Sequence, residues 1–445
     1  MLKTLRNAWK IKDLRKKLIF TFLMLIVIRF GSQMPIPGVN TTYFADFFAK
    51  QSGDAFSFFD AMTGGSFTSM SLFALSITPY ITSSIIMQLM TIAIPKLEEM
   101  QRDGEDGRKK IAEYTRYLTV ALALIQSVAM AIGFGGQGLL VDYNLQTGLG
   151  KAGMVIVAVA AMTAGSALLM WIGERITENG VGNGISIVLL FNIISSLPDD
   201  AVMLHDRFLN GKKVPVIALT VIIILALIVA MVVFVIILQD GERRIPVQYS
   251  KKMVGRKMVG GQSSHIPLKV NTAGVIPVIF ASSIMSFPVV IAQFFHPDYT
   301  TFGGKILVML NSSSWFKAES PANSIGLVIY IALIVVFAYF YTSITFNPLE
   351  VANNMKKQGG FIPGIRPGKP TSDYLNRILN YIVFIGACGL TIVCVIPIAI
   401  SGIFSVSRLS FGGTSLIIIV GVVLETLKAI ESQMLVRNYK GFLND

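Results

Sequence analysis

Long runs of apolar residues, separated by shorter polar stretches, are the dominant pattern along the chain. A helix needs about 20 apolar residues to cross about 30 Å of hydrocarbon. Ten runs approach or reach that length, so the pattern predicts ten membrane-spanning helices. The predicted spans are residues 18–34, 71–94, 115–134, 152–172, 184–198, 214–239, 272–295, 323–346, 377–398 and 413–431.

The first span follows a basic segment, an order that is also typical of a cleaved signal peptide. No small-x-small cleavage pattern comes after it, and the next residues are MPIPG. We therefore predict an uncleaved first span. Residues 1–17 place Leu2, Leu5 and Trp9 on one side and are predicted to form an interfacial helix at the cytoplasmic surface.

The composition also indicates a membrane protein. Of the 445 residues, 53% are hydrophobic and 14% are charged, and the mean hydropathy is +0.65. A soluble domain carries roughly 25% charged residues. With the N-terminus in the cytoplasm, 29 Lys and Arg residues fall on the cytoplasmic side of the predicted spans and eight on the other. This agrees with the positive-inside rule, predicts that both termini are cytoplasmic, and concentrates the net charge of +13 on one face.

Two of the spans, 71–94 and 272–295, carry many neutral polar residues and a proline each near mid-span. Polar side chains at membrane depth must face protein or water. Packed helices use Ser and Thr as interhelical hydrogen-bonding groups, which is the simpler explanation for either span alone. Two such spans together favour a polar boundary that can open. Its predicted residues are Thr82, Ser83, Gln88, Pro277, Ser282 and Ser283.

The interiors of the third to ninth spans contain no Asp, Glu, Lys, Arg or His. Proton- or ion-coupled transporters usually keep ionisable groups near the midplane, so this absence argues against that class. The chain also has no HExxH, GxSxG or phosphate-loop motif, and its three histidines lie in separate loops. We therefore expect no catalytic residues, no metal site and no cofactor.

Residues 55–70, AFSFFDAMTGGSFTSM, are apolar but too short to span a membrane. An external loop has little reason to keep so many large apolar side chains. We predict a re-entrant segment that folds back into the protein; the alternative is an amphipathic helix on the outer surface. Its candidate residues are Phe58, Phe59, Met62, Gly64 and Gly65.

Two cytoplasmic loops, 240–270 and 347–377, are long and basic. RRIPVQY and SSHIPLKV in the first are predicted to be the two arms of a hairpin. The second contains FIPGIRPGKPT, residues 361–371, whose prolines restrict the backbone. A stiff loop loses less entropy on docking, which favours a binding role over a merely solvated loop. The partner would be RNA or an acidic protein surface.

Seven long motifs identify a resemblance that runs from about residue 15 to 440. The chain resembles the SecY family, the central subunits of the bacterial Sec protein translocase. The motifs are RFGSQMPIPG, FALSITPYITSSIIMQL, GRKKIAEYTRY, ITENGVGNGISI, SSHIPLKVNTAGVIPVIFASSI, FNPLEVANNMKKQGGFIPGIRPG and FGGTSLIIIV.

The resemblance implies an all-α polytopic membrane protein with ten helices in two inverted, pseudo-symmetric halves that open like a clamshell. The N-terminal half would be residues 18–198 and the C-terminal half 199–431, followed by a cytoplasmic tail, 432–445. Residues 55–70 would be the plug that seals the pore from outside. The second and third spans would face the seventh and eighth across a lateral gate, through which membrane segments leave sideways into lipid.

The resemblance also implies a pore ring and a docking surface. The ring would consist of the aliphatic residues Ile77, Ile81, Ile185, Leu189, Ile279 and Ile418. Ile77 and Ile81 share a helix face, and a dry aliphatic constriction resists ions by dewetting. Docking of the SecA ATPase or the ribosome would use Arg243, Arg244, Arg256, Lys257, Lys356, Lys357 and Arg366.

The expected function is a protein-conducting channel in the bacterial plasma membrane. It would pass unfolded secretory and membrane preproteins without hydrolysing anything itself. SecE and SecG are the expected membrane partners, anionic lipid is expected to contact the basic face, and no small-molecule cofactor is expected. The rival hypothesis is a secondary transporter for a small solute, since inverted repeats are also typical of that class.

Overall fold

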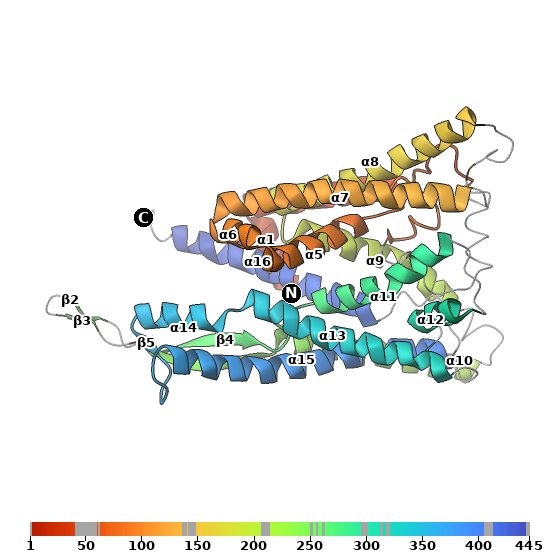
Figure 1. Ribbon diagram of the computed structural model, residues 1–445. Helices are drawn as coiled ribbons and strands as arrows, with labels where there is room; N and C mark the ends of the chain where they lie inside the picture. Colours follow the sequence, from red (N-terminus) through yellow and green to blue (C-terminus); the bar gives the residue numbers. More distant parts are fainter. Residues whose placement is uncertain are drawn as a thin grey trace.

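The computed structural model describes residues 2–40, 60, 63–135, 140, 148–205, 214–249, 252–254, 257–259, 263–294, 301–311, 315–316, 321–404 and 413–441. Each of the ten predicted spans coincides with an α-helix (Figure 1). The ten helices are α2 (Lys12–Gln33), α5 (Thr78–Ala93), α7 (Glu105–Phe134), α8 (Leu149–Asn179), α9 (Gly184–Leu204), α10 (Val214–Asp240), α11 (Ile276–Phe294), α13 (Ile325–Thr345), α15 (Lys369–Phe404) and α16 (Gly413–Gly441).

Shorter elements connect these helices. They are α1 (Leu2–Lys10), α6 (Pro95–Arg102), α12 (Phe302–Leu310), a 3₁₀ turn (Pro321–Ser324) and α14 (Pro348–Lys357). By length and composition, five helical stretches of the described chain can cross a membrane, and a sixth can if α5 and α6 count as one bent span. The apolar parts of α9 and α11 are shorter, Gly184–Pro198 and Ile276–Met285. This architecture fits the predicted all-α membrane protein.

Some predicted boundaries were wrong. Residues 71–77 form turns rather than the first part of the second span, and α5 begins at Thr78 with Pro79 in its first turn. Proline suits this position because a helix leaves its first backbone N–H groups unbonded anyway. At the other end, Pro95 begins α6 after a bend of 106° between α5 and α6. Helix α7 starts ten residues before the predicted third span, at Glu105, because its polar first turns still form a regular helix.

The N-terminal segment also differs from the prediction. Instead of one interfacial helix over residues 1–17, α1 ends at Lys10 and α2 begins at Lys12. A small apolar cluster explains the break, because it draws the connection between the two helices toward α16. Its buried members are Ala8, Leu14, Val181 and Ile430, and Ile11 packs against them.

The spanning helices pack in two groups with the same order. In the first group α5 packs against α7, α7 against α8, and α8 against α9. In the second group α11 packs against α13, α13 against α15, and α15 against α16. Separate apolar clusters lie in the two groups, one around Met162 and Ala131 and the other around Ile334 and Val393. Contacts between the groups include α9 with α16 and α7 with α11.

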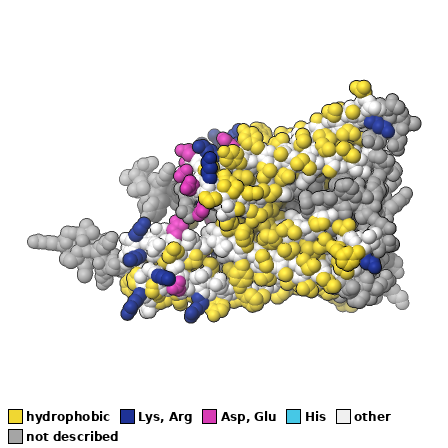
Figure 2. Space-filling view, in the orientation of Figure 1, with side chains coloured by type: hydrophobic (Ala, Val, Ile, Leu, Met, Phe, Trp, Pro, Cys, Tyr) yellow, Lys and Arg dark blue, Asp and Glu magenta, His cyan; other side chains and the backbone are white. Residues whose placement is uncertain are grey.

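Charge is distributed unevenly along the molecule. Figure 2 shows Lys, Arg, Asp and Glu side chains gathered at the end that holds α6 and α14, while apolar side chains cover the middle of the helical bundle. Many apolar side chains on α10 are exposed, among them Ile222, Ile223 and Ile237. Exposed apolar side chains at mid-helix are expected where the neighbour is lipid rather than water.

The basic loops form β-structure at the charged end. Strand β1 (Glu242–Tyr249) pairs antiparallel with β4 (Ser263–Lys269), with Arg244 opposite Pro267. This confirms the predicted hairpin arms. Beyond them, β2 (Lys252–Val254) pairs with β3 (Lys257–Val259), and these two strands project from the body of the molecule (Figure 1). The short strand β5 (Gly360–Phe361), which comes from the other basic loop, pairs with the free edge of β1.

Candidate functional site

All six residues of the predicted pore ring meet in one apolar cluster. Ile77 precedes α5 and Ile81 lies on it, Ile185 and Leu189 lie on α9, Ile279 lies on α11, and Ile418 lies on α16. Ile77, Leu189 and Ile418 are buried, and the other three are partly buried. Four helices, two from each packing group, therefore bring these side chains to one place.

The cluster is closed by close packing. Phe73, Ile172 and Ile176 are buried members of the same cluster. Gly173 on α8 makes this approach possible: a Cβ atom there would lie 3.1 Å from Ile185 Cγ1 and 3.6 Å from Ile77 Cδ1. Aliphatic side chains in such close contact leave little room for water between them.

The described part of the predicted plug lies inside the protein. Phe58, Phe59 and Met62 lie outside the described residues, whereas residues 63–70 are mostly buried. Phe67 and Met70 belong to the apolar cluster around Met162. This burial favours the re-entrant segment over an amphipathic helix on the outer surface.

Gly64 and Gly65 both adopt the left-handed backbone conformation, with φ values of +65° and +81°. Only Gly64 is in close contact with another helix. A Cβ atom at Gly64 would lie 2.6 Å from Ser195 Oγ and 2.9 Å from the backbone oxygen of Asn192, both on α9. The carbonyl of Gly64 also accepts a hydrogen bond from Arg29 Nη1 at 3.3 Å. Glycine is needed here for both its φ and its missing side chain.

The predicted gate residues divide into two sets. Ser83 on α5 is hydrogen-bonded to Thr119 on α7, and Ser282 on α11 is hydrogen-bonded to Tyr330 on α13 at 3.2 Å. These two serines join helices within a group rather than across the boundary, which matches the simpler explanation of polar residues in packed helices. In the second set, the hydroxyl of Thr82 donates to the Thr78 carbonyl of its own helix at 3.0 Å. Gln88 and Ser283 are partly buried, and Pro277 is buried.

The two basic loops share one small apolar core. Ile245 and Val247 of β1 and Leu268 of β4 pack with Met355 of α14 and Ile362, which follows β5. Leu375 and Ile378 of α15 complete the core. The 361–371 segment is therefore fixed to the hairpin and to a spanning helix, which supplies the rigidity that its prolines predicted.

Most of the predicted docking residues stand exposed on this structure. Arg243, Arg244, Lys356, Lys357 and Arg366 are exposed, and the side chain of Arg244 pairs with Glu242 at 2.6 Å. Lys257 lies in β3, and Arg256 lies outside the described residues. The Arg366 carbonyl accepts a hydrogen bond from Thr371 Oγ1 at 2.8 Å, which fixes the backbone that carries the guanidinium group.

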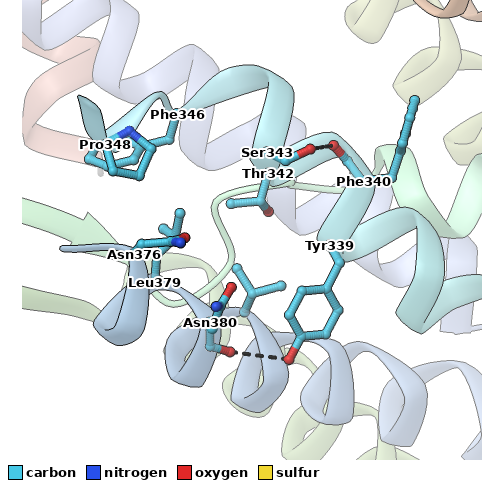
Figure 3. Close-up of a pocket in the computed structure, with 10 residues that line it drawn as sticks. Tyr339, Phe340, Thr342, Ser343, Phe346, Pro348, Asn376, Leu379 and Asn380 are labelled. Atoms are coloured by element: carbon cyan, nitrogen blue, oxygen red, sulfur yellow. Dashed lines mark hydrogen bonds between the residues drawn. The ribbon is translucent and has the colours of Figure 1, made fainter. Parts of the chain in front are cut away.

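A recess of about 360 Å³ lies between α13, α14 and α15, next to this core (Figure 3). Tyr339, Phe346, Asn376 and Asn380 are among its lining residues, and Tyr339 Oη donates to the Asn380 carbonyl at 3.2 Å. The hydroxyl of Ser343 donates to the Phe340 carbonyl. The lining contains no acid, base or cysteine. Within the described ranges, no three His, Cys, Asp or Glu residues are placed to hold a metal ion.

The structure also reveals a polar contact that sequence reasoning missed. Asn192 on α9 donates from Nδ2 to Ser76 Oγ at 3.1 Å, next to Ile77 of the ring. The available signal was a single amide in the mostly apolar start of α9, GISIVLLFNII. Polar residues at membrane depth are uncommon, and they usually bind a polar partner or serve a function.

Comparisons with known proteins agree with this geometry. A family model described as SecY matches residues 71–427. The protein translocase subunit SecY of Halalkalibacterium halodurans is 42% identical over 450 residues, with complete coverage of both chains. A solved structure described as a protein-conducting channel superposes with a TM-score of 0.61 at 16% identity, covering 95% of this chain and 93% of that one. Sec61 in the canine ribosome-channel complex superposes with a TM-score of 0.59 at 16% identity, covering 95% and 93%.

Proposed function

The chain belongs to the SecY family of protein translocase subunits and forms a protein-conducting channel, and we propose that polypeptides cross the membrane through the centre of its six-residue ring. The observation that carries this proposal is the convergence of six aliphatic side chains from both helix groups in one buried cluster. A ring made by two groups opens when the groups separate, and it closes again without any covalent change.

The chemistry of the ring suits a varied substrate. Aliphatic side chains provide no charge or hydrogen-bonding group that would trap one particular sequence. The β-branched isoleucines are stiff at χ1, and such side chains can form a gasket around a moving chain. When the path is empty, the same side chains exclude water and ions. Residues 55–70 act as the plug that supports this seal from the outside.

The lateral gate lies between α5 with α7 and α11 with α13. Ser83–Thr119 and Ser282–Tyr330 hold each of these helix pairs together, so that each pair moves as a unit. The contact of α7 with α11 then marks where the two units part. Hydrophobic segments of a preprotein leave through this opening into lipid, since transfer of apolar surface into hydrocarbon is favourable.

The exposed cations on the two basic loops dock the SecA ATPase or the ribosome on the cytoplasmic side. The shared apolar core keeps them in place before the partner arrives, and this lowers the entropic cost of binding. ATP hydrolysis belongs to SecA and elongation to the ribosome; this chain catalyses no reaction. The chain resides in the bacterial plasma membrane with both termini cytoplasmic, assembles with SecE and SecG, and contacts anionic lipid with its basic face.

A photo-crosslinking residue at Ile81 tests the path. A secretory protein stalled in mid-transit is expected to crosslink at this position only when SecA and ATP are present. Crosslinks from Ile81 to neighbouring helices alone would show that the path lies elsewhere. Solute uptake by liposomes that lack SecA tests the rival function, because saturable uptake of a small solute would identify a secondary transporter.

A further inference from the structure

Asn192 is a buried amide at a junction of three structural elements. It lies on α9 one turn after Leu189 of the ring, and only 4% of its surface is exposed. Its Nδ2 group donates to Ser76 Oγ at 3.1 Å. A buried amide needs such a partner, because an unsatisfied polar group in a low-dielectric interior is costly. Loss of the bond would therefore affect Ser76 as well as Asn192.

Ser76 has an unusual backbone conformation. Its φ value is +51°, and the residue is buried. Non-glycine residues rarely adopt this conformation, and such positions persist only where surrounding contacts hold them. Among the contacts here, the Asn192 amide donates to the Ser76 hydroxyl, and Ser166 Oγ, from α8, donates to the Ser76 carbonyl at 3.2 Å. The next residue, Ile77, is the first residue of the ring and precedes α5.

The same turn of α9 also holds the described part of the plug. The backbone of Gly64 lies against Asn192, close enough that a Cβ atom at Gly64 would be 3.1 Å from Asn192 Cα. Ser195 Oγ donates to the Asn192 carbonyl at 2.8 Å and lines the same contact. One residue of α9 thus contacts both Gly64 and Ser76, the two ends of the segment that leads into α5.

We propose that Asn192 is a positioning residue of the closed channel, which holds Ser76 through its amide and Gly64 through its backbone. Helix α9 also packs against α16 of the other helix group, so a movement of the groups that shifts α9 relative to the turn before α5 breaks the Asn192–Ser76 bond. The same shift removes one of the contacts that hold the strained turn before Ile77 and moves the backbone of α9 away from Gly64. The plug segment at Gly64 and the turn that precedes α5 are thereby released together. This inference rests on the proposed channel function.

The test compares Asn192→Leu, Ser76→Ala and the double variant in liposomes that also contain SecE and SecG. Leucine keeps the branching and the number of side-chain heavy atoms of asparagine and removes the donor, while Ser76→Ala removes the acceptor from the other side. Ser196→Ala is the matched control, because Ser196 is also buried on α9 and its hydroxyl donates to the Ile193 carbonyl of the same helix at 2.8 Å. The readouts are ion leak without SecA and ATP-driven transport of a preprotein.

Each single variant is expected to raise the resting ion leak about fivefold while preprotein transport continues, which is the shift that loss of one buried hydrogen bond produces. The double variant should leak no more than the larger single one, because both changes remove the same bond. The control should leak like the unaltered chain.

Two results would overturn the inference: a leak from Asn192→Leu no greater than that from Ser196→Ala, or, if Asn192→Leu does not accumulate, an unchanged leak from Ser76→Ala. Failure of the proposed channel function would be seen separately: the unaltered chain would then transport no preprotein when SecA and ATP are supplied.

Discussion

Replacing Ile362 with alanine should release the 361–371 segment from its support without altering any basic residue. Only 3% of the Ile362 surface is exposed, and the side chain packs in the core shared by both basic loops. Ile362→Ala removes three carbon groups, worth about 2.4 kcal/mol at about 0.8 kcal/mol for each. The cavity left behind adds to this, and measured isoleucine-to-alanine losses in cores are about 2–5 kcal/mol. We therefore expect about 3 kcal/mol of lost local stability.

A loss of that size changes the local opening equilibrium on the order of 100-fold, since about 1.4 kcal/mol corresponds to a factor of ten. Hydrogen exchange measures this opening directly at the amides of residues 360–366 and of their strand partner β1. Ile362→Val is the matched control. It removes one carbon group and should cost about 0.5–1.5 kcal/mol.

The functional consequence follows from the population of the ordered loop. A partner that binds only the ordered form has an apparent affinity reduced by the fraction of time that this form is present. The SecA concentration that gives half-maximal transport should therefore rise for Ile362→Ala, while the rate at saturating SecA recovers. Faster exchange with an unchanged SecA requirement would refute the role of preorganisation. Unchanged exchange would show that Ile362 does not hold the segment.

Two further predictions concern the docking surface and the plug. Arg366→Glu should abolish SecA-driven export while the chain still inserts normally, because the exposed guanidinium is replaced by an opposite charge on a fixed backbone. An export assay measures the first effect and an immunoblot of membranes the second. Normal export would contradict the docking role. Gly64→Ala should raise the resting ion leak well above that of Gly65→Ala. Both positions have positive φ, but a Cβ atom meets α9 only at Gly64 and has nothing within 4 Å at Gly65; equal leaks would show that backbone strain, rather than the contact with α9, is responsible.

The polar residues of the second and seventh spans show how far sequence reasoning reaches. Ser83 and Ser282 were recognisable as residues that need a protein neighbour, because lipid offers no hydrogen bond. Which neighbour they use was not recognisable. The hydroxyl partners, Thr119 and Tyr330, lie 36 and 48 residues away along the chain. Nothing in the local pattern distinguishes a bond within one helix group from a bond across the gate.

For the 361–371 segment, too, the sequence predicted the local structure but not its partner. Its prolines predicted a stiff loop, and the two strand-like stretches of the 240–270 loop predicted a hairpin. Their union in one sheet, with Phe361 opposite Gln248, was not predicted. A two-residue strand has no detectable periodicity, so only the edge of β1 and the apolar core beneath it define β5.

The sequence by itself determined the class of protein, the ten helical segments and the uneven distribution of charge, and its motifs identified the family. These properties depend on short stretches of chain, because each span must satisfy its own backbone hydrogen bonds in lipid and each flanking charge acts locally. The tertiary structure decided that six aliphatic residues meet in one cluster and that Asn192 contacts Ser76, 116 positions away. Such contacts depend on how whole helices pack against one another. The packing energy is distributed over many residues, so no single position in the sequence encodes it.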